Sequence, residues 1–129
     1  MIDAQRVDFI RVPVTDMAEA NHFYGDLLGL RRNPNSPADD WVEYELGNVT
    51  LAVMTPHTHE YEFTPLPPST IAIRVADVAE AKAKLEAAGL EVGEMWDSGR
   101  CRGAGVNDPA GNRILLHHRY APYPDGSLP

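Results

Sequence analysis

The chain has 129 residues, which is enough for one domain with a hydrophobic core and no disulfides. Its hydrophobic content of 43% argues against intrinsic disorder, and its net charge of −8 argues against nucleic acid and anionic membranes as partners. The single cysteine, Cys101, allows no internal disulfide, and the polar start Met1–Arg6 lacks an apolar signal core. Because no apolar run is long enough to cross a bilayer, we expect a cytoplasmic protein.

The first half of the chain predicts one helix among several strands. The strands are expected at residues 7–14, 30–33, 41–46 and 49–54. The helix is expected at 17–28, where apolar residues form one stripe. Asp16 and Glu19 are spaced as a capping box at its start, and Gly29 follows as its C-cap. Gly47-Asn48 between the last two strands is typical of a tight hairpin.

A proline-rich linker at about 56–68 separates this half from a second half with the same plan. The strands of the second half are expected at residues 70–75, 90–96, 101–106 and 113–119. Its helix is expected at 78–88, with Asp77 and Glu80 as another capping box. The segment Asp108–Gly111 predicts a type I turn before the last strand.

The two halves are copies of one module. Phe9–Ala20 matches Thr70–Ala81 at a constant offset, and Gly47-Asn48 matches Gly111-Asn112 near the module ends. Two unrelated strand–helix starts would explain only the first match. We expect one domain over 1–129, with modules at about 5–55 and 69–119 and a proline-rich tail at 120–129. The predicted fold is α+β, with two βαβββ modules forming a curved mixed sheet around a cavity and the helices outside.

Two motifs carry a family resemblance. One is Val14-Thr15-Asp16 followed by Phe23–Leu30, and the other is Asn107–Asn112. On these motifs the chain resembles the vicinal oxygen chelate superfamily, the group of glyoxalases, bleomycin-resistance proteins and extradiol dioxygenases. The resemblance covers nearly the whole chain, and it implies the two-module fold and a homodimer.

The resemblance also identifies the positions where a metal would be held. Metal-dependent members of the family place one ligand on the first strand and one on the last strand of each module. The corresponding positions here are Phe9, Leu51, Thr70 and Leu115. Phenyl and isobutyl groups offer no lone pairs and one Thr hydroxyl is a weak ligand, so we expect no metal and no cofactor. A relocated site at His57, His59 or His117 stays open, beside the simpler interpretation of residues 57–59 as a polar loop.

Strand alternation from these positions predicts the wall of the cavity. The residues expected to line it are Phe9, Arg11, Tyr44, Leu51, Thr70, Arg74, Cys101, Leu115 and His117. This lining suits a small, mostly apolar or aromatic ligand with one anionic or carbonyl group. Two alternatives stay open: the apolar side chains fill the hole, and the arginines pair with carboxylates.

Three functions follow from this reasoning. The leading hypothesis is a glyoxalase- or bleomycin-resistance-like protein that lacks the usual metal ligands and binds a small molecule. The alternative is an enzyme related to lyases, isomerases or dioxygenases with a non-standard site at Cys101 or His117, although no neighbour in the sequence would orient either residue. The third is a structural or interaction module with a filled pocket.

Overall fold

The computed structural model describes residues 1–36, 39–56, 62–68 and 70–129. His57 and His59 therefore lie outside the described residues. The chain divides into two compact units, Met1–Leu66 and Pro67–Pro129. Each unit contains one helical segment and one mixed four-stranded sheet, so the predicted α+β fold of two βαβββ modules is confirmed. In the described residues, no helix is long and apolar enough to span a membrane.

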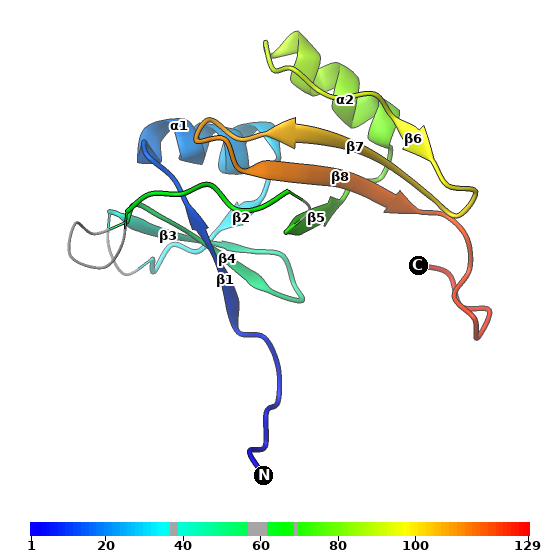
Figure 1. Ribbon diagram of the computed structural model, residues 1–129, viewed down its shortest axis with the longest axis horizontal. Coiled ribbons are helices and arrows are strands. Elements are labelled where there is room, and N and C mark those ends of the chain that lie inside the picture. The colour runs from blue at the N-terminus through cyan, green and yellow to red at the C-terminus, as the bar shows by residue number, and fades with distance from the viewer. Residues whose placement is uncertain (37–38, 57–61, 69) are drawn as a thin grey trace. The chain divides into compact units, whose positions relative to one another are not determined.

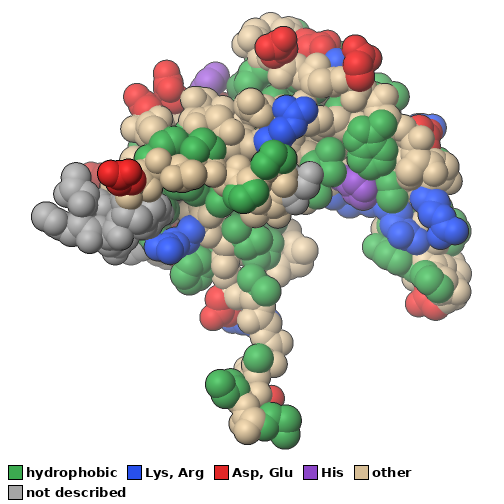
Figure 2. All heavy atoms as spheres, viewed as in Figure 1, with side chains coloured by type: hydrophobic (Ala, Val, Ile, Leu, Met, Phe, Trp, Pro, Cys, Tyr) green, Lys and Arg blue, Asp and Glu red, His purple; other side chains and the backbone are tan. Residues whose placement is uncertain are grey.

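The first unit is a sheet with a helix on one face (Figure 1). Its strands are β1 (Phe9–Pro13), β2 (Arg31–Arg32), β3 (Trp41–Glu45) and β4 (Thr50–Met54), in the order β1-β4-β3-β2. β1 runs parallel to β4, and the other neighbours are antiparallel. Before β1, the N-terminal residues form an extended arm with exposed apolar side chains, which include Ile2 and Val7 (Figure 2).

The helix predicted at 17–28 is present, but its second half is a π-helix. α1 (Met17–Asn21) is followed by the π-helix η1 (His22–Leu27). Asp16 caps the start as predicted, because its Oδ1 accepts a hydrogen bond from the Glu19 amide at 3.0 Å. The wider turn buries two consecutive aromatic rings, Phe23 and Tyr24, which meet edge to face at 4.9 Å.

The second unit repeats this plan. It consists of β5 (Ile71–Arg74), α2 (Val78–Ala87), β6 (Trp96–Asp97), β7 (Cys101–Asn107) and β8 (Arg113–Arg119). The strand order is β5-β8-β7-β6, with β5 parallel to β8. Asp77 caps α2 through the Glu80 amide at 2.9 Å, and the helix packs on β7 and β8.

β6 is much shorter than the strand predicted at 90–96. Before Trp96, only an isolated bridge joins Val92 to Val106 on β7. The reason is a side chain on α2: Lys82 Nζ donates hydrogen bonds to the carbonyls of Val92 and Gly93, at 3.0 and 3.2 Å. These bonds hold the segment against the helix instead of in a regular ladder.

Candidate ligand-binding face of the second unit

The second sheet has two chemically different faces. The face toward α2 is buried and apolar, and it consists of Ile71, Ile73, Ala104, Val106, Ile114 and Leu116. The opposite face is called the far face here. Its strand residues are Ala72, Arg74, Trp96, Cys101, Gly103, Gly105, Asn107, Arg113, Leu115, His117 and Arg119. Burial of the apolar face against α2 fixes which residues the far face presents.

The far face gathers four of the residues predicted to line a cavity: Arg74, Cys101, Leu115 and His117. These four residues therefore share one face of the sheet, as strand alternation predicts. Thr70 stands just before β5, and its hydroxyl donates to the Pro67 carbonyl at 2.7 Å. His118 points to the opposite face and bonds the Val75 carbonyl through Nδ1 at 2.8 Å, so the two adjacent histidines do not act together.

An indole ring from the edge strand β6 lies on the far face. Trp96 lies over Gly103, where a Cβ would come within 2.3 Å of the ring. Its centroid is 6.1 Å from the imidazole of His117. Although the ring rests on the sheet, Trp96 keeps 42% of its surface exposed. Solvent, or a ligand, can therefore reach this aromatic surface.

A guanidinium group occupies the equivalent position over the next glycine of the far face. A Cβ on Gly105 would come within 2.4 Å of Arg113 Nη2, and one on Gly93 would stand 3.3 Å from the same atom. Arg113 Nη1 also bonds Asn107 Oδ1 at a long 3.4 Å. Two glycines at alternate positions of β7 thus admit two planar groups close to the backbone.

The far face is positive although the chain is acidic. Its charged strand residues are Arg74, Arg113 and Arg119, and none of the described strand residues on this face is Asp or Glu. Arg74 is exposed and donates to the Arg119 carbonyl at 3.3 Å. Arg119 itself holds the C-terminal tail through the carbonyls of Ala121 and Pro122. Arg74 and Arg113 are therefore the cations available to a ligand.

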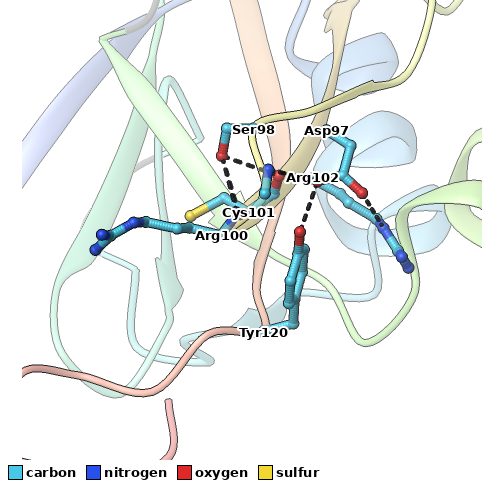
Figure 3. Close-up of polar contacts among 7 residues, drawn as sticks. Asp97, Ser98, Arg100, Cys101, Arg102 and Tyr120 are labelled. Atoms are coloured by element: carbon cyan, nitrogen blue, oxygen red, sulfur yellow. Dashed lines mark hydrogen bonds and ion pairs between the residues drawn. The ribbon is translucent and has the colours of Figure 1, made fainter.

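The hairpin from β6 to β7 is held by a network of polar contacts (Figure 3). The Asp97 carboxylate accepts hydrogen bonds from the Tyr120 hydroxyl at 2.7 Å, the Gly99 amide at 2.8 Å and Arg102 Nε at 3.1 Å. In that order these donors lower the pKa of Asp97 to about 2. The Asp97 contact also raises the pKa of Tyr120.

Cys101 lies at one end of the far face, beside this network. Its amide donates to Ser98 Oγ at 3.1 Å, and its side chain is half-buried. The next residue along the strand, Arg102, points away from Cys101 (Figure 3). It stacks instead on Tyr120, with Cζ 5.1 Å from the ring centre.

In the first unit, the prediction that Phe9, Tyr44 and Leu51 share a face is wrong. β1 and β4 pair Phe9 with Thr50 and Ile10 with Leu51, so Phe9 and Leu51 point to opposite faces. Leu51 and Tyr44 are buried on the helix side, where Tyr44 Oη donates to Asn21 Oδ1 at 2.7 Å. Phe9 and Arg11 lie on the face away from the helix, and Phe9 packs edge to face on Trp41 at 5.7 Å.

The error arises from the lengths of two hairpin loops. Leu46 bonds Val49 across Gly47-Asn48, whereas Asp108 bonds Asn112 across residues 109–111, a loop one residue longer. If the two modules are aligned on Gly47 and Gly111, the last strand of the first module is therefore placed one residue out of register with the last strand of the second. Pairing of Ile10 with Leu51 and of Ile71 with Ile114 makes Ala52 the structural equivalent of Leu115.

The positions that the resemblance assigns to metal ligands are then Phe9, Ala52, Thr70 and Leu115. With one hydroxyl as their only side-chain donor, they do not fit a divalent metal. Elsewhere in the described residues, His, Cys, Asp and Glu form no group of three or more that could hold an ion.

Trp96 is a residue of the far face that strand alternation did not predict. It stood at the end of a predicted strand whose register could not be fixed from sequence. The alternate glycines Gly103 and Gly105 were the available signal, because glycine within a strand marks close approach of another group.

Comparisons with known proteins agree with this fold. A sequence model of the Glyoxalase/Bleomycin resistance protein/Dioxygenase superfamily matches residues 6–116. A search of the curated proteins gives no match.

Three solved structures illustrate the likeness. A superfamily member from Sphaerobacter thermophilus has 21% identity and a TM-score of 0.74, with 90% of this chain and 98% of that chain covered. The antibiotic binding protein TnmS3 from Streptomyces sp. CB03234 has 23% identity and a TM-score of 0.72, covering 92% and 99%. Lactoylglutathione lyase from Agrobacterium tumefaciens has 20% identity and a TM-score of 0.68, covering 90% and 95%. At these identities the structures show the shared fold, and the family match assigns the chain. The protein belongs to the Glyoxalase/Bleomycin resistance protein/Dioxygenase superfamily.

Proposed function

We propose that the protein binds a small planar aromatic anion on the far face and that it does so without a metal. The observation that carries this proposal is the Trp96 indole, seated on Gly103 beside His117 on a face whose charged strand residues are all arginine. An exposed indole attracts a flat aromatic group by stacking, which is worth about 0.5–1.5 kcal/mol beyond area burial. Arg74 and Arg113 supply the partners for an anionic group.

Binding without catalysis is supported by two further points. TnmS3, which has this fold, is named an antibiotic binding protein. The family positions for a metal carry the Thr70 hydroxyl as their only side-chain donor, which removes the usual basis for catalysis in metal-dependent members. An enzyme using His117 as a base would need a partner to orient the imidazole. Among the described residues, the ring has only the aromatic contact with Trp96.

Naphthoate is a suitable probe because it is flat, aromatic and anionic, and naphthamide is its uncharged counterpart. We expect calorimetry to show that naphthoate binds the protein more tightly than naphthamide. Trp96→Leu should remove most of the binding of both compounds. Arg113→Gln should weaken naphthoate by about tenfold or more, because a hydrogen bond to a charged group contributes about 1.5–3 kcal/mol. Naphthamide should be affected much less.

Lys84→Gln is the matched control, because it removes an exposed cation from α2, where Lys84 pairs with Glu80. It should leave naphthoate binding unchanged. The proposal fails if the wild-type protein does not bind naphthoate at millimolar concentration. It also fails if Trp96→Leu binds as well as the wild type while keeping its thermal stability.

We also propose that the protein is a homodimer. The resemblance implies this state, and the exposed Ile2 and Val7 of the N-terminal arm offer apolar surface for it (Figure 2). Sedimentation equilibrium at micromolar concentration should give twice the chain mass, and a monomer mass there would contradict the proposal.

A further inference from the structure

A second candidate site lies in the first unit, on the helix side of its sheet. A groove of about 360 Å³ runs between the helical segment and the edge strand β2. Its wall on one side is the helix stripe that includes Asn21, His22 and Asp26, and its wall on the other side is Arg32. The far face belongs to the other unit, so the groove is not part of the site proposed above.

The groove is open because of a glycine in the π-helix. Gly25 faces Tyr44, and a Cβ on Gly25 would stand only 3.3 Å from Tyr44 Oη. Any larger side chain at position 25 would project over the tyrosine and fill the space. A π-helix is a rare departure from α-helical geometry that is often found at functional sites, and η1 places Gly25 and Asp26 along the groove.

Groups of opposite charge stand at the groove. Asp26 Oδ2 contacts His22 Nδ1 at 3.0 Å. The Arg32 guanidinium forms no hydrogen bond or ion pair with any residue in the part of the chain that the structure describes. Both charges act on Tyr44: burial raises the pKa of this phenol, the Arg32 charge lowers it, and the Asp26 charge raises it.

We propose that this groove binds a free amino acid with an aliphatic side chain. Arg32 would take the carboxylate, because a guanidinium offers paired donors that match its geometry. Asp26 would take the ammonium group, and the aliphatic side chain would lie against Ala18 and Leu30, the apolar residues of the lining. A zwitterion meets both charges at once. A simple anion would leave Asp26 with His22 as its only charged contact, and a simple cation would leave Arg32 without an ion pair among the described residues.

The test uses leucine and two fragments of it: isocaproate, which lacks the ammonium group, and isoamylamine, which lacks the carboxylate. Calorimetry or chemical-shift titration should show that leucine binds at least about tenfold more tightly than either fragment. Arg32→Gln should weaken leucine and isocaproate by about tenfold and leave isoamylamine unchanged. Asp26→Asn should weaken leucine and isoamylamine and leave isocaproate unchanged.

Arg31→Gln is the matched control, because Arg31 is the other residue of β2 and alternation points it to the opposite face. It should leave leucine binding unchanged. The inference is overturned if leucine does not bind, or if Arg31→Gln weakens it as much as Arg32→Gln. Loss of leucine binding in Trp96→Leu would also overturn it, since that result would place the amino acid on the far face. The naphthoate and leucine experiments can therefore fail independently.

Discussion

The Trp96 indole and Gly103 are packed so closely that any side chain at position 103 would strike the ring. A Cβ there would lie 2.3 Å from one ring carbon and 2.6 Å from another. The two residues are direct partners in the antiparallel pair β6 and β7. This contact links the short strand β6 to the far face, and it sets the position of the aromatic surface that we propose as a ligand platform.

Gly103→Ala should therefore displace Trp96. We expect a loss of stability of about 1–3 kcal/mol, the usual range for overpacking, measured by urea unfolding. Naphthoate binding should weaken in parallel. In a Trp96→Ala background the same substitution should cost almost nothing, because the ring that it would strike is gone. Equal costs in the two backgrounds would show that the indole does not rest on Gly103.

Asp97 makes the folding stability of the protein depend on pH in the acidic range. The Tyr120 hydroxyl, the Gly99 amide and Arg102 lower its pKa to about 2, from an ordinary value of 3.8. A lowered folded-state pKa means that the stabilisation is fully present above about pH 4 and is lost as the pH falls toward about 2. The stability difference between wild type and Asp97→Asn should therefore shrink over this interval.

Urea unfolding between neutral pH and about pH 2 measures this difference. Asp3→Asn makes the same change of charge in the exposed N-terminal arm, at a residue with no hydrogen bond to any described residue. The stability difference between wild type and Asp3→Asn should not shrink in the same way as the pH falls. A constant difference between wild type and Asp97→Asn down to about pH 2 would contradict the network.

Sequence alternation predicted the far face because β7 and β8 form a long, regular ladder. Arg113, Leu115 and His117 alternate along β8, and β7 follows them residue by residue. Alternation failed in the first unit because it was anchored at a turn whose length differs between the two modules. A shift of one residue moves every side chain of a strand to the other face. Tyr44 and Leu51 were therefore predicted on the wrong face of the first sheet.

Two further features of the fold could not be predicted from local sequence patterns. The π-helix at His22–Leu27 could not be predicted from the apolar stripe. The spacing of its apolar residues suits an ordinary α-helix: Phe23, Tyr24, Leu27 and Leu28. The shortening of β6 depends on Lys82, which lies on another element and reaches the carbonyls of Val92 and Gly93. Such tertiary contacts override strand propensity.

The corrected register makes Leu51 a core residue. It is 1% exposed on the helix side of the first sheet. Leu51→Ala should destabilise the protein by about 2–5 kcal/mol, because the substitution leaves a cavity among buried side chains. It should leave the binding of naphthoate to the folded protein unchanged. Thermal unfolding and calorimetry measure the two effects, and a stable variant with altered binding would contradict this assignment.

Purified protein should hold no stoichiometric divalent ion at Phe9, Ala52, Thr70 and Leu115. Phe9 and Thr70 are equivalent positions in the internal repeat. Ala52 and Leu115 are equivalent positions in the two sheets, because Ala52 follows the partner of Ile10 and Leu115 follows the partner of Ile71. Loss of one ligand leaves a weakened site, but loss of nearly all donors removes the coordination bonds. The apolar groups in their place make it costly to desolvate an ion.

Elemental analysis after dialysis tests this directly. About one zinc, nickel, iron or manganese per chain that disappears on substitution of Thr70 or Leu115 would contradict the prediction. Metal that is retained in those variants but lost on substitution of His57, His59 or His117 would show a relocated site. In that case a metal-bound water could serve as a nucleophile, and the enzyme hypothesis would replace simple binding. Leucine and naphthoate binding that persists unchanged in the presence of a chelator would agree with the metal-free sites, because stacking and guanidinium contacts need no ion.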